Sequence, residues 1–474
     1  LNMPLILPGN VGSATAGGFN VANSCRFDGS SAYMHKTPGS AGNTKLWTWS
    51  AWIKKSLPDG ADLGIFGQYI DANNFFRIRY RSDQRLQVDN YTSGSATFSV
   101  ILGSNNEHRD ISAWYNLVVA YDSAQGTDSN RVKIYVNGVL QTVFQAATYP
   151  SQNVVTTLPV DGTPIELGRT TDSQFFNGYF AEVVLIDGTA LAPTSFGEFD
   201  SNSNIWKPID VSGLTFGTNG FYLDFEASGN LGNDANGGTD LTEVNLAATD
   251  QTTDTCTNNF ATLNALDNFY FGGTFTEGNC KVLSIAGVES YITSTIAVST
   301  GKWYWEIKVT ASGSGRDQIG IADKVSDNTD FSPISGNARV EMYYGYTGNH
   351  YSPDTGNNSY GDSFGAGDII GVALDLDNHK LYFSKNGTFQ ASGDPTSGAT
   401  GTGAIAVATD PADGVYYAVF ANIHNTASTF EANFGNPTFS ISSGNTDGDG
   451  YGNFEYAVPS GYFSLNTKNL AEYG

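Results

Sequence analysis

The stretch GDIIGVALDLDNHKLYFSKNG, residues 367–387, decides the fold class of the second half of the chain. Two short runs in which apolar and polar residues alternate are separated by the polar turn Asp377-Asn378-His379, and Lys385-Asn386-Gly387 forms a second turn. Alternation with a period of two, bounded by Asn, Asp and Gly, is typical of strands joined in a hairpin. We therefore expect a strand, a turn, a second strand and a second turn.

The composition extends this expectation to the whole chain. The 474 residues include 55 Gly, 25 Tyr and 29 Phe but only 3 Met, and 15% are charged. Gly, Asn, Ser and Thr separate short aromatic and β-branched runs, and no long run repeats every 3.6 residues. A chain of this length is expected to form more than one core, and this composition favours strands. We predict an all-β protein built of antiparallel β-sandwiches in tandem.

The strand pattern is equally clear in the first half. In WTWSAWIKK, four alternate residues would share one face of a strand: Trp47, Trp49, Ala51 and Ile53. RVKIYVNG alternates as well and ends in the turn signal Asn137-Gly138. We divide the chain into an N-terminal arm (1–20), a first sandwich (21–200), a Gly- and Asn-rich connector (201–260) and a second sandwich with a C-terminal extension (261–474).

The first sandwich resembles a known family. FDGSSAY, WSAWIKK, WYNLVVAYD, RVKIYVNGV and FNGYFAEVVLIDG follow one another like the strands of a laminin-G-like domain of the concanavalin-like jelly-roll class. Such domains often bind one calcium ion at the rim of the sandwich. The resemblance makes Asp28, after the first strand, and Asp187, after the last, candidate oxygen donors; no other cofactor is expected.

The second sandwich resembles a SPRY domain, a bent β-sandwich known from protein-recognition modules. The matching phrases are GKWYWEIKV, QIGIAD, the hairpin quoted above, YYAVFAN and FEANFG. The resemblance implies that Ile370, Val372 and Leu374 belong to the core of the sandwich, and that the loops between strands carry the binding residues.

The whole chain resembles virion proteins of tailed phages, particularly marine ones. This similarity rests on the order of the two domains and on three long phrases, AEVVLIDGTALAPTSFGEFDSNSNIWKP, TCTNNFATLNALDN and GYGNFEYAVPSGYFSLNTKNLAEYG. It implies a fibre or appendage on the particle surface that binds a host glycan or protein, joins other virion proteins through its arm and is a homo-oligomer. A purely structural decoration or cement protein is the alternative.

The richest candidate recognition surface lies between residues 346 and 360, where tyrosines stand among Gly, Asn, Asp and Ser. Flat rings beside amides and carboxylates suit both sugar stacking and protein contact. The candidate residues are Tyr346, His350, Tyr351, Asp354, Asn357, Asn358 and Tyr360. We expect them on an exposed loop.

The net charge of −24, from 23 basic and 47 acidic residues, argues against nucleic acid and anionic lipid as partners because both would be repelled. No apolar run approaches the length of about 18 residues that a membrane span needs, and the start LNMPLILPGN is too short and uncharged for a signal peptide. Cys25, Cys256 and Cys280 follow no metal-ligand spacing and are expected to be buried thiols.

Two acidic motifs could in principle serve catalysis or bind calcium. Asp224 and Glu226 would share one face of a strand, as the two carboxylates of a glycan depolymerase could. NTDGDGYGNFEY places Asp447 in a loop that resembles the calcium loop of an EF-hand, but Tyr456 stands where the bidentate Glu is required. We expect an acidic strand edge and a turn, respectively, and no enzyme.

Overall fold

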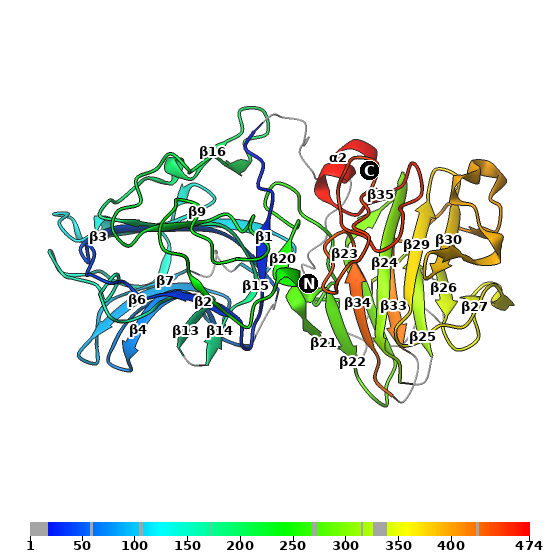
Figure 1. Ribbon diagram of the computed structural model, residues 1–474, viewed down its shortest axis with the longest axis horizontal. Coiled ribbons are helices and arrows are strands. Elements are labelled where there is room, and N and C mark those ends of the chain that lie inside the picture. The colour runs from blue at the N-terminus through cyan, green and yellow to red at the C-terminus, as the bar shows by residue number, and fades with distance from the viewer. Residues whose placement is uncertain are drawn as a thin grey trace. The chain divides into compact units, whose positions relative to one another are not determined.

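The computed structural model describes residues 18–56, 60–103, 108–171, 173–267, 273–313, 316–325, 339–422 and 426–474. The described chain divides into two compact units, residues 17–257 and 258–474. Strands dominate both units (Figure 1), which confirms the all-β prediction. Residues 1–17 of the expected arm lie outside the described residues.

The first unit contains two stacked eight-stranded sheets (Figure 1). One has the order β10-β9-β8-β3-β15-β1-β20, with β18 also on β15, and the other β11-β7-β6-β5-β4-β12-β2-β19. The strands of the first sheet are β1 (Ser24–Asp28), β3 (Leu46–Lys55), β8 (Trp114–Asp122), β9 (Val132–Val136), β10 (Val139–Leu140), β15 (Asn177–Asp187), β18 (Phe221–Leu223) and β20 (Gln251–Thr252). Those of the second are β2 (Tyr33–Lys36), β4 (Leu63–Asp71), β5 (Asn74–Tyr80), β6 (Leu86–Thr92), β7 (Ser95–Leu102), β11 (Phe144–Thr148), β12 (Ile165–Leu167) and β19 (Thr242–Val244).

The alternating residues of β3 form the core between these sheets, as predicted. Trp47, Trp49, Ala51 and Ile53 are fully buried in it. The Trp49 ring stacks on Phe66 of β4 with 5.4 Å between centroids, and Trp47 meets Phe76 of β5 edge to face at 5.0 Å. Aromatic pairs of this geometry add to the free energy gained by burying the rings.

The prediction of a connector at residues 201–260 is wrong for most of that range, because residues 201–257 belong to the first unit. β18 pairs with β15, β19 with β2 and β20 with β1. Phe221 and Leu241 are buried with the main core. These strands have only two or three residues each and are separated by Gly- and Asn-rich turns, so they show no periodicity that a sequence could reveal.

The same segment explains why both faces of β3 and β15 are buried. Trp206 of the hairpin β16 (Gly197–Phe199) and β17 (Trp206–Pro208) packs with Trp52 in a second cluster on the far face of the sheet. Tyr222 joins Val184 in a third. A further hairpin, β13 (Arg169–Thr171) and β14 (Gln174–Phe175), completes the unit.

The second unit is also a sandwich of two sheets (Figure 1). Its larger sheet contains β21 (Gly273–Thr276), β22 (Lys281–Ser284), β24 (Lys302–Ala311), β29 (Ile369–Asp375), β30 (Lys380–Lys385), β31 (Thr388–Phe389), β32 (Ile405–Ala406), β34 (Thr429–Asn433) and β35 (Phe463–Ser464). The other has the order β23 (Ser290–Val298), β33 (Tyr416–Asn422), β25 (Asp317–Ala322), β26 (Val340–Tyr344), β27 (Asn349–Ser352) and β28 (Gly356–Ser359).

The hairpin predicted for residues 367–387 is present as β29 and β30. The two strands are antiparallel, and their paired residues run from Ile370 opposite Lys385 to Asp375 opposite Lys380. Ile370, Val372 and Leu374 are buried as expected. Asn386 and Gly387 both adopt positive φ, 48° and 79°, in the second turn, which is the backbone that an Asn-Gly pair tolerates.

Little of the described chain is helical beyond short 3₁₀ turns and α2 (Thr467–Tyr473). No described helix has the length and apolar character needed to cross a membrane. Cys25 and Cys280 are buried free thiols, as expected, and Cys256 is half-buried.

Candidate functional site

The expected loop at residues 346–360 is instead a pair of short strands at the edge of a sheet. β27 pairs with β26 and with β28, and β28 is the last strand of its sheet among the described residues. The polar residues of GNNS take strand conformation because they pair with β27. Four residues are too few to show a strand periodicity in the sequence.

Tyr346 lies in the turn between β26 and β27 and is the most exposed large hydrophobic side chain of the described residues, at 60%. The Tyr344 ring lies 6.3 Å from it, and the Arg316 guanidinium lies 5.7 Å from the centre of the Tyr346 ring. A cation over an aromatic face is attracted by the ring quadrupole. Tyr346 is therefore exposed and also held in place by two neighbours.

The pairing register extends this surface toward the edge strand. Tyr344 lies opposite Asn349, and Asn349 lies opposite Ser359. Directly paired residues share one face of a sheet. The surface around Tyr344 and Tyr346 therefore continues into two small polar residues. We use the name tyrosine corner for the surface formed by Arg316, Tyr344, Tyr346, Asn349 and Ser359.

His350 and Asn358 do not belong to this surface. They lie opposite each other, one register position away, and so face the other side of the sheet. His350 Nε2 is 2.5 Å from a carboxylate oxygen of Glu341 on β26, and both side chains are largely buried. The His350–Glu341 contact fixes β27 to β26, and Asn358 donates to the carbonyl of Thr355 within the hairpin turn.

Tyr360 is a packing residue rather than an exposed contact. Its hydroxyl accepts the backbone N–H of Phe383 at 3.1 Å, and its ring meets Tyr343 and Phe383 edge to face. Burial raises its pKa to about 12. Tyr351 is half-buried and packs against the apolar cluster that contains Met342. The expectation of an exposed loop is therefore wrong for Tyr360, because a ring between two aromatic neighbours gains more from burial than from exposure.

Asp354 and Asn357 are exposed, but they are separated from Tyr346 by their positions in the hairpin. Asp354 forms an ion pair with Arg339 at 2.8 Å, and Arg339 also forms an ion pair with Asp410. Asn357 lies opposite Tyr351, on the same face as Asn349 and Ser359 but two positions further from Tyr346. Of the seven candidates, Tyr346 is thus the one in the tyrosine corner.

Arg316 was not found from the sequence. It precedes β25 and reaches Tyr346 because Gln318 of β25 pairs with Tyr344 of β26. No local pattern marks this proximity, since pairing between distant strands decides it.

The two candidate calcium donors do not lie together. Asp28 pairs with Asn177 at the start of β15, whereas Asp187 ends that strand, roughly 30 Å away at about 3.3 Å per residue. They cannot share one ion, and the prediction of a joint site is wrong.

Each of these carboxylates is also already satisfied by donors. Asp28 accepts the N–H groups of Ser30, Ser31 and Ala32 at 2.8–2.9 Å. Burial opposes its ionisation, but these bonds outweigh burial and lower its pKa to about 2. Asp187 accepts the backbone N–H groups of Asn43 and Asn219 and lines an open pocket of about 470 Å³. No cluster of three metal-ligating side chains occurs among the described residues.

The two other acidic motifs are turns. Asp224 and Glu226 follow the end of β18, and the Glu226 N–H donates to Asp224 Oδ1 at 3.0 Å. Asp447 accepts from the N–H groups of Asp449, Tyr451 and Ser464 and from the Asn469 amide, and so holds the C-terminal extension to the sandwich. The absence of a strand at Asp224 and Glu226 removes the shared face that a carboxylate pair would have needed.

A second polar and aromatic surface covers the outward face of β4, β5 and β6. Phe75 stacks on Tyr91 with 4.6 Å between centroids, and Arg77 lies over Phe75 and donates two bonds to Asp89. Because Phe75 is 7% exposed and Asp89 fully buried, this ladder stabilises the sheet and presents little ring surface.

Comparison with known protein families agrees with this architecture. Residues 28–194 match the family described as the concanavalin A-like lectin/glucanases superfamily, and residues 302–436 match the SPRY domain. The chain carries a laminin-G-like domain followed by a SPRY domain. No curated protein matches the chain.

Several solved structures are similar to parts of this chain. The SPRY domain of human HERC1 is 19% identical and covers 32% of this chain and 86% of its own, with a TM-score of 0.26. A putative carbohydrate binding protein from Bacteroides ovatus is 16% identical, covering 48% of this chain and 61% of its own, with a TM-score of 0.34. Domain 4 of AbnA, an extracellular arabinanase from Geobacillus stearothermophilus, is 17% identical, covering 39% and 87%, with a TM-score of 0.28.

Proposed function

We propose that this chain is a non-enzymatic appendage of a phage particle that binds a glycan or a protein on the host surface. The binding part of the proposal is carried by Tyr346, whose ring is 60% exposed yet held by Arg316 and Tyr344. A ring that is already ordered loses little entropy when it meets a ligand, which favours binding.

The tyrosine corner has the chemistry of a sugar- or peptide-binding surface. Tyr346 offers an aromatic ring, Arg316 donates hydrogen bonds, and Asn349 and Ser359 provide neutral donors and acceptors. Repetition of the appendage on a particle would allow each site to be weak, because avidity multiplies the affinities of linked sites.

The virion part of the proposal is supported by the three long phrases that resemble tailed-phage proteins. In this role, the arm at residues 1–20 joins the chain to other virion proteins, and the protein is located on the surface of the particle. The rival role, a decoration or cement protein, shares the arm but needs no host ligand.

Binding of the purified protein to intact host cells and to a glycan array separates these roles. The proposal predicts saturable binding to cells or to a class of glycans, with no release of sugar from host polysaccharide. A cement protein would bind neither cells nor glycans and would bind phage particles that lack it. Release of soluble sugar would instead establish a depolymerase.

A further inference from the structure

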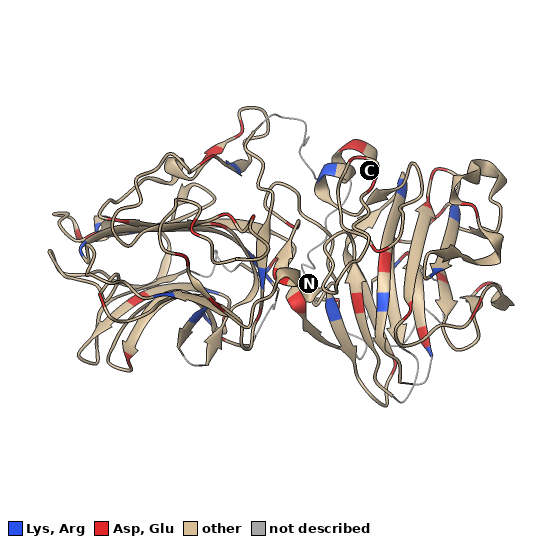
Figure 2. Ribbon diagram, viewed as in Figure 1, with Lys and Arg blue, Asp and Glu red and all other residues tan. Residues whose placement is uncertain are grey.

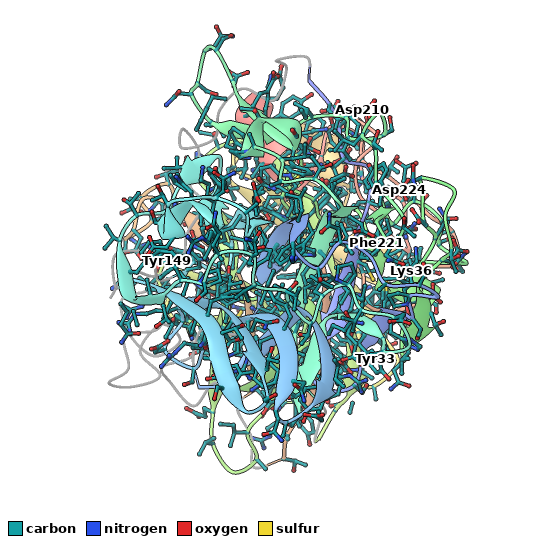
Figure 3. All side chains as sticks on the ribbon, turned by 90° about the vertical axis from the view of Figure 1, so that its left-hand side faces the viewer. Tyr33, Lys36, Tyr149, Asp210, Phe221 and Asp224 are labelled. Carbon is teal, nitrogen blue, oxygen red and sulfur yellow. The ribbon has the colours of Figure 1, made fainter. Side chains whose placement is uncertain are left out.

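The side of the first unit that carries β10 and β11 is an edge of both sheets. Among the residues that the structure describes, β10 ends one sheet and β11 ends the other, and residues 141–143 join the two strands directly. Both strands therefore lie on the same side of the sandwich. Tyr149, which follows β11 and is labelled in Figure 3, marks this side and packs against Phe144.

This edge exposes apolar side chains. Val139, Leu140 and Val143 are 55%, 42% and 52% exposed, and all three are among the exposed large hydrophobic side chains of the described residues. Residues 145–148 of β11 are exposed as well. An edge strand also presents backbone N–H and C=O groups that a second strand can pair with.

The edge carries no charge. Residues 134–160 contain no Lys, Arg, His, Asp or Glu, and neither does β7, the strand that pairs with β11. Elsewhere, basic and acidic residues are spread over both units (Figure 2), and the chain has a net charge of −24. Two copies of such an acidic molecule repel each other, and this repulsion is weakest where neither surface carries charge.

Natural sheet edges are usually protected from pairing by Lys, by Pro or by a bulge. β11 has one irregularity, between Phe144 and Ala146, and then continues in regular register with β7 from Ala146 to Thr148. No charge and no proline interrupts these residues. The protection expected of a strand that must stay unpaired is therefore incomplete.

We propose that β11 pairs with β11 of a second copy of this chain, antiparallel and about a two-fold axis. An antiparallel pair of identical strands is self-complementary, so that both copies use the same surface. The partner strand would cover Ala146 and Ala147 and bring its own Val139 and Val143 beside those of the first copy. The pairing does not depend on the host ligand proposed above.

Sedimentation of the purified full chain over a range of protein concentrations tests this proposal. We expect the wild type to sediment as a dimer, and more completely at high salt, because salt screens the repulsion between the two acidic copies. The double variant Val139→Lys/Ala147→Lys should sediment as a monomer and still unfold in a cooperative thermal transition, since both positions are exposed. If the double variant does not fold, Ala147→Lys alone serves the same purpose.

The matched control is Thr127→Lys/Ser129→Lys, which adds the same charge to the exposed turn before β9 and should remain a dimer. A monomeric wild type, a trimer, or a dimer that both double variants preserve would overturn the proposal. Loss of host-cell binding by the tyrosine corner would leave this result untouched, so the two proposals fail separately.

Discussion

Glu182 shows how a single residue can make this fold sensitive to pH. It lies in β15 where the register against β3 shifts, with a positive φ of 50°, and its side chain is buried. The Tyr222 hydroxyl donates to its carboxylate at 2.7 Å. Burial, with smaller contributions from the negative charges of Asp224, Glu226 and Asp210, raises the pKa of Glu182 to about 8 despite this bond (Figure 3 labels Asp210 and Asp224).

This pKa predicts that the protein loses stability as the pH rises from about 4.5 to about 8. The folded state keeps the proton of Glu182 up to about pH 8, whereas an unfolded chain releases it near 4.5. Between these values the folded state binds more protons, so the free energy of unfolding falls as the pH rises from 4.5 through 8. Glu182→Gln should flatten this decline in denaturant unfolding curves measured from pH 5 to 9.

The control for this prediction is Glu472→Gln on the exposed face of α2, which should keep the decline of the wild type. A decline of the same steepness in Glu182→Gln would show that other groups cause the pH dependence.

At the scale of single elements, the strands that could be predicted are those with enough residues to show a period. β3, β9, β29 and β30 have five to ten residues each, and the core residues predicted for β3 and β29 are buried. β27 and β28 have four mostly polar residues each and are held by pairing with neighbouring strands in hairpins. β18 and β20 have three and two residues and exist through pairing with distant strands. Local sequence carries too little information to predict such strands.

The same limit explains the outcome for the candidate site. Tyr346 and Tyr360 occur in similar Gly-, Asn- and Ser-rich surroundings, yet one is exposed and the other packs against Phe383. The difference arises because Tyr360 follows the edge strand and turns back over the larger sheet. Sequence identified the region, whereas the division into contact and packing residues required the fold.

Unfolding of tyrosine variants tests this division. Tyr360→Ala should lower the free energy of unfolding by about 3 kcal/mol, since it removes a packed aromatic ring. Tyr360→Phe keeps the ring and loses the acceptor for the Phe383 N–H, which should cost about 1 kcal/mol. Tyr346→Ala should change stability by less than about 0.5 kcal/mol, as expected for an exposed position. Equal losses for Tyr346→Ala and Tyr360→Ala would contradict the assignment.

At the scale of the whole molecule, the boundary between the units predicts how the chain can be divided. Residues 17–257 contain their own core, to which Phe221, Leu223 and Leu241 belong. A fragment of residues 17–257 should therefore unfold in one cooperative thermal transition. A fragment that ends at residue 200 lacks β18, β19 and β20 and should show no such transition, or one at a much lower temperature.

Circular dichroism and calorimetry of the two fragments provide the measurement. If the fragment of residues 21–200 melts at the same temperature as the longer one, then residues 201–257 act as a connector after all. Fragment 258–474 serves as an internal comparison, because the division at residue 257 leaves its strands complete.

We propose that this chain binds a host ligand through the tyrosine corner, and the affinity of the Tyr346→Ala variant for intact host cells is the decisive measurement. We expect a loss of roughly 1 to 3 kcal/mol, that is about 5- to 150-fold weaker binding, with an unchanged melting temperature. Phe199→Ala, which removes an exposed ring from the first unit, should bind like the wild type. Equal affinity of the wild type and Tyr346→Ala would contradict the account.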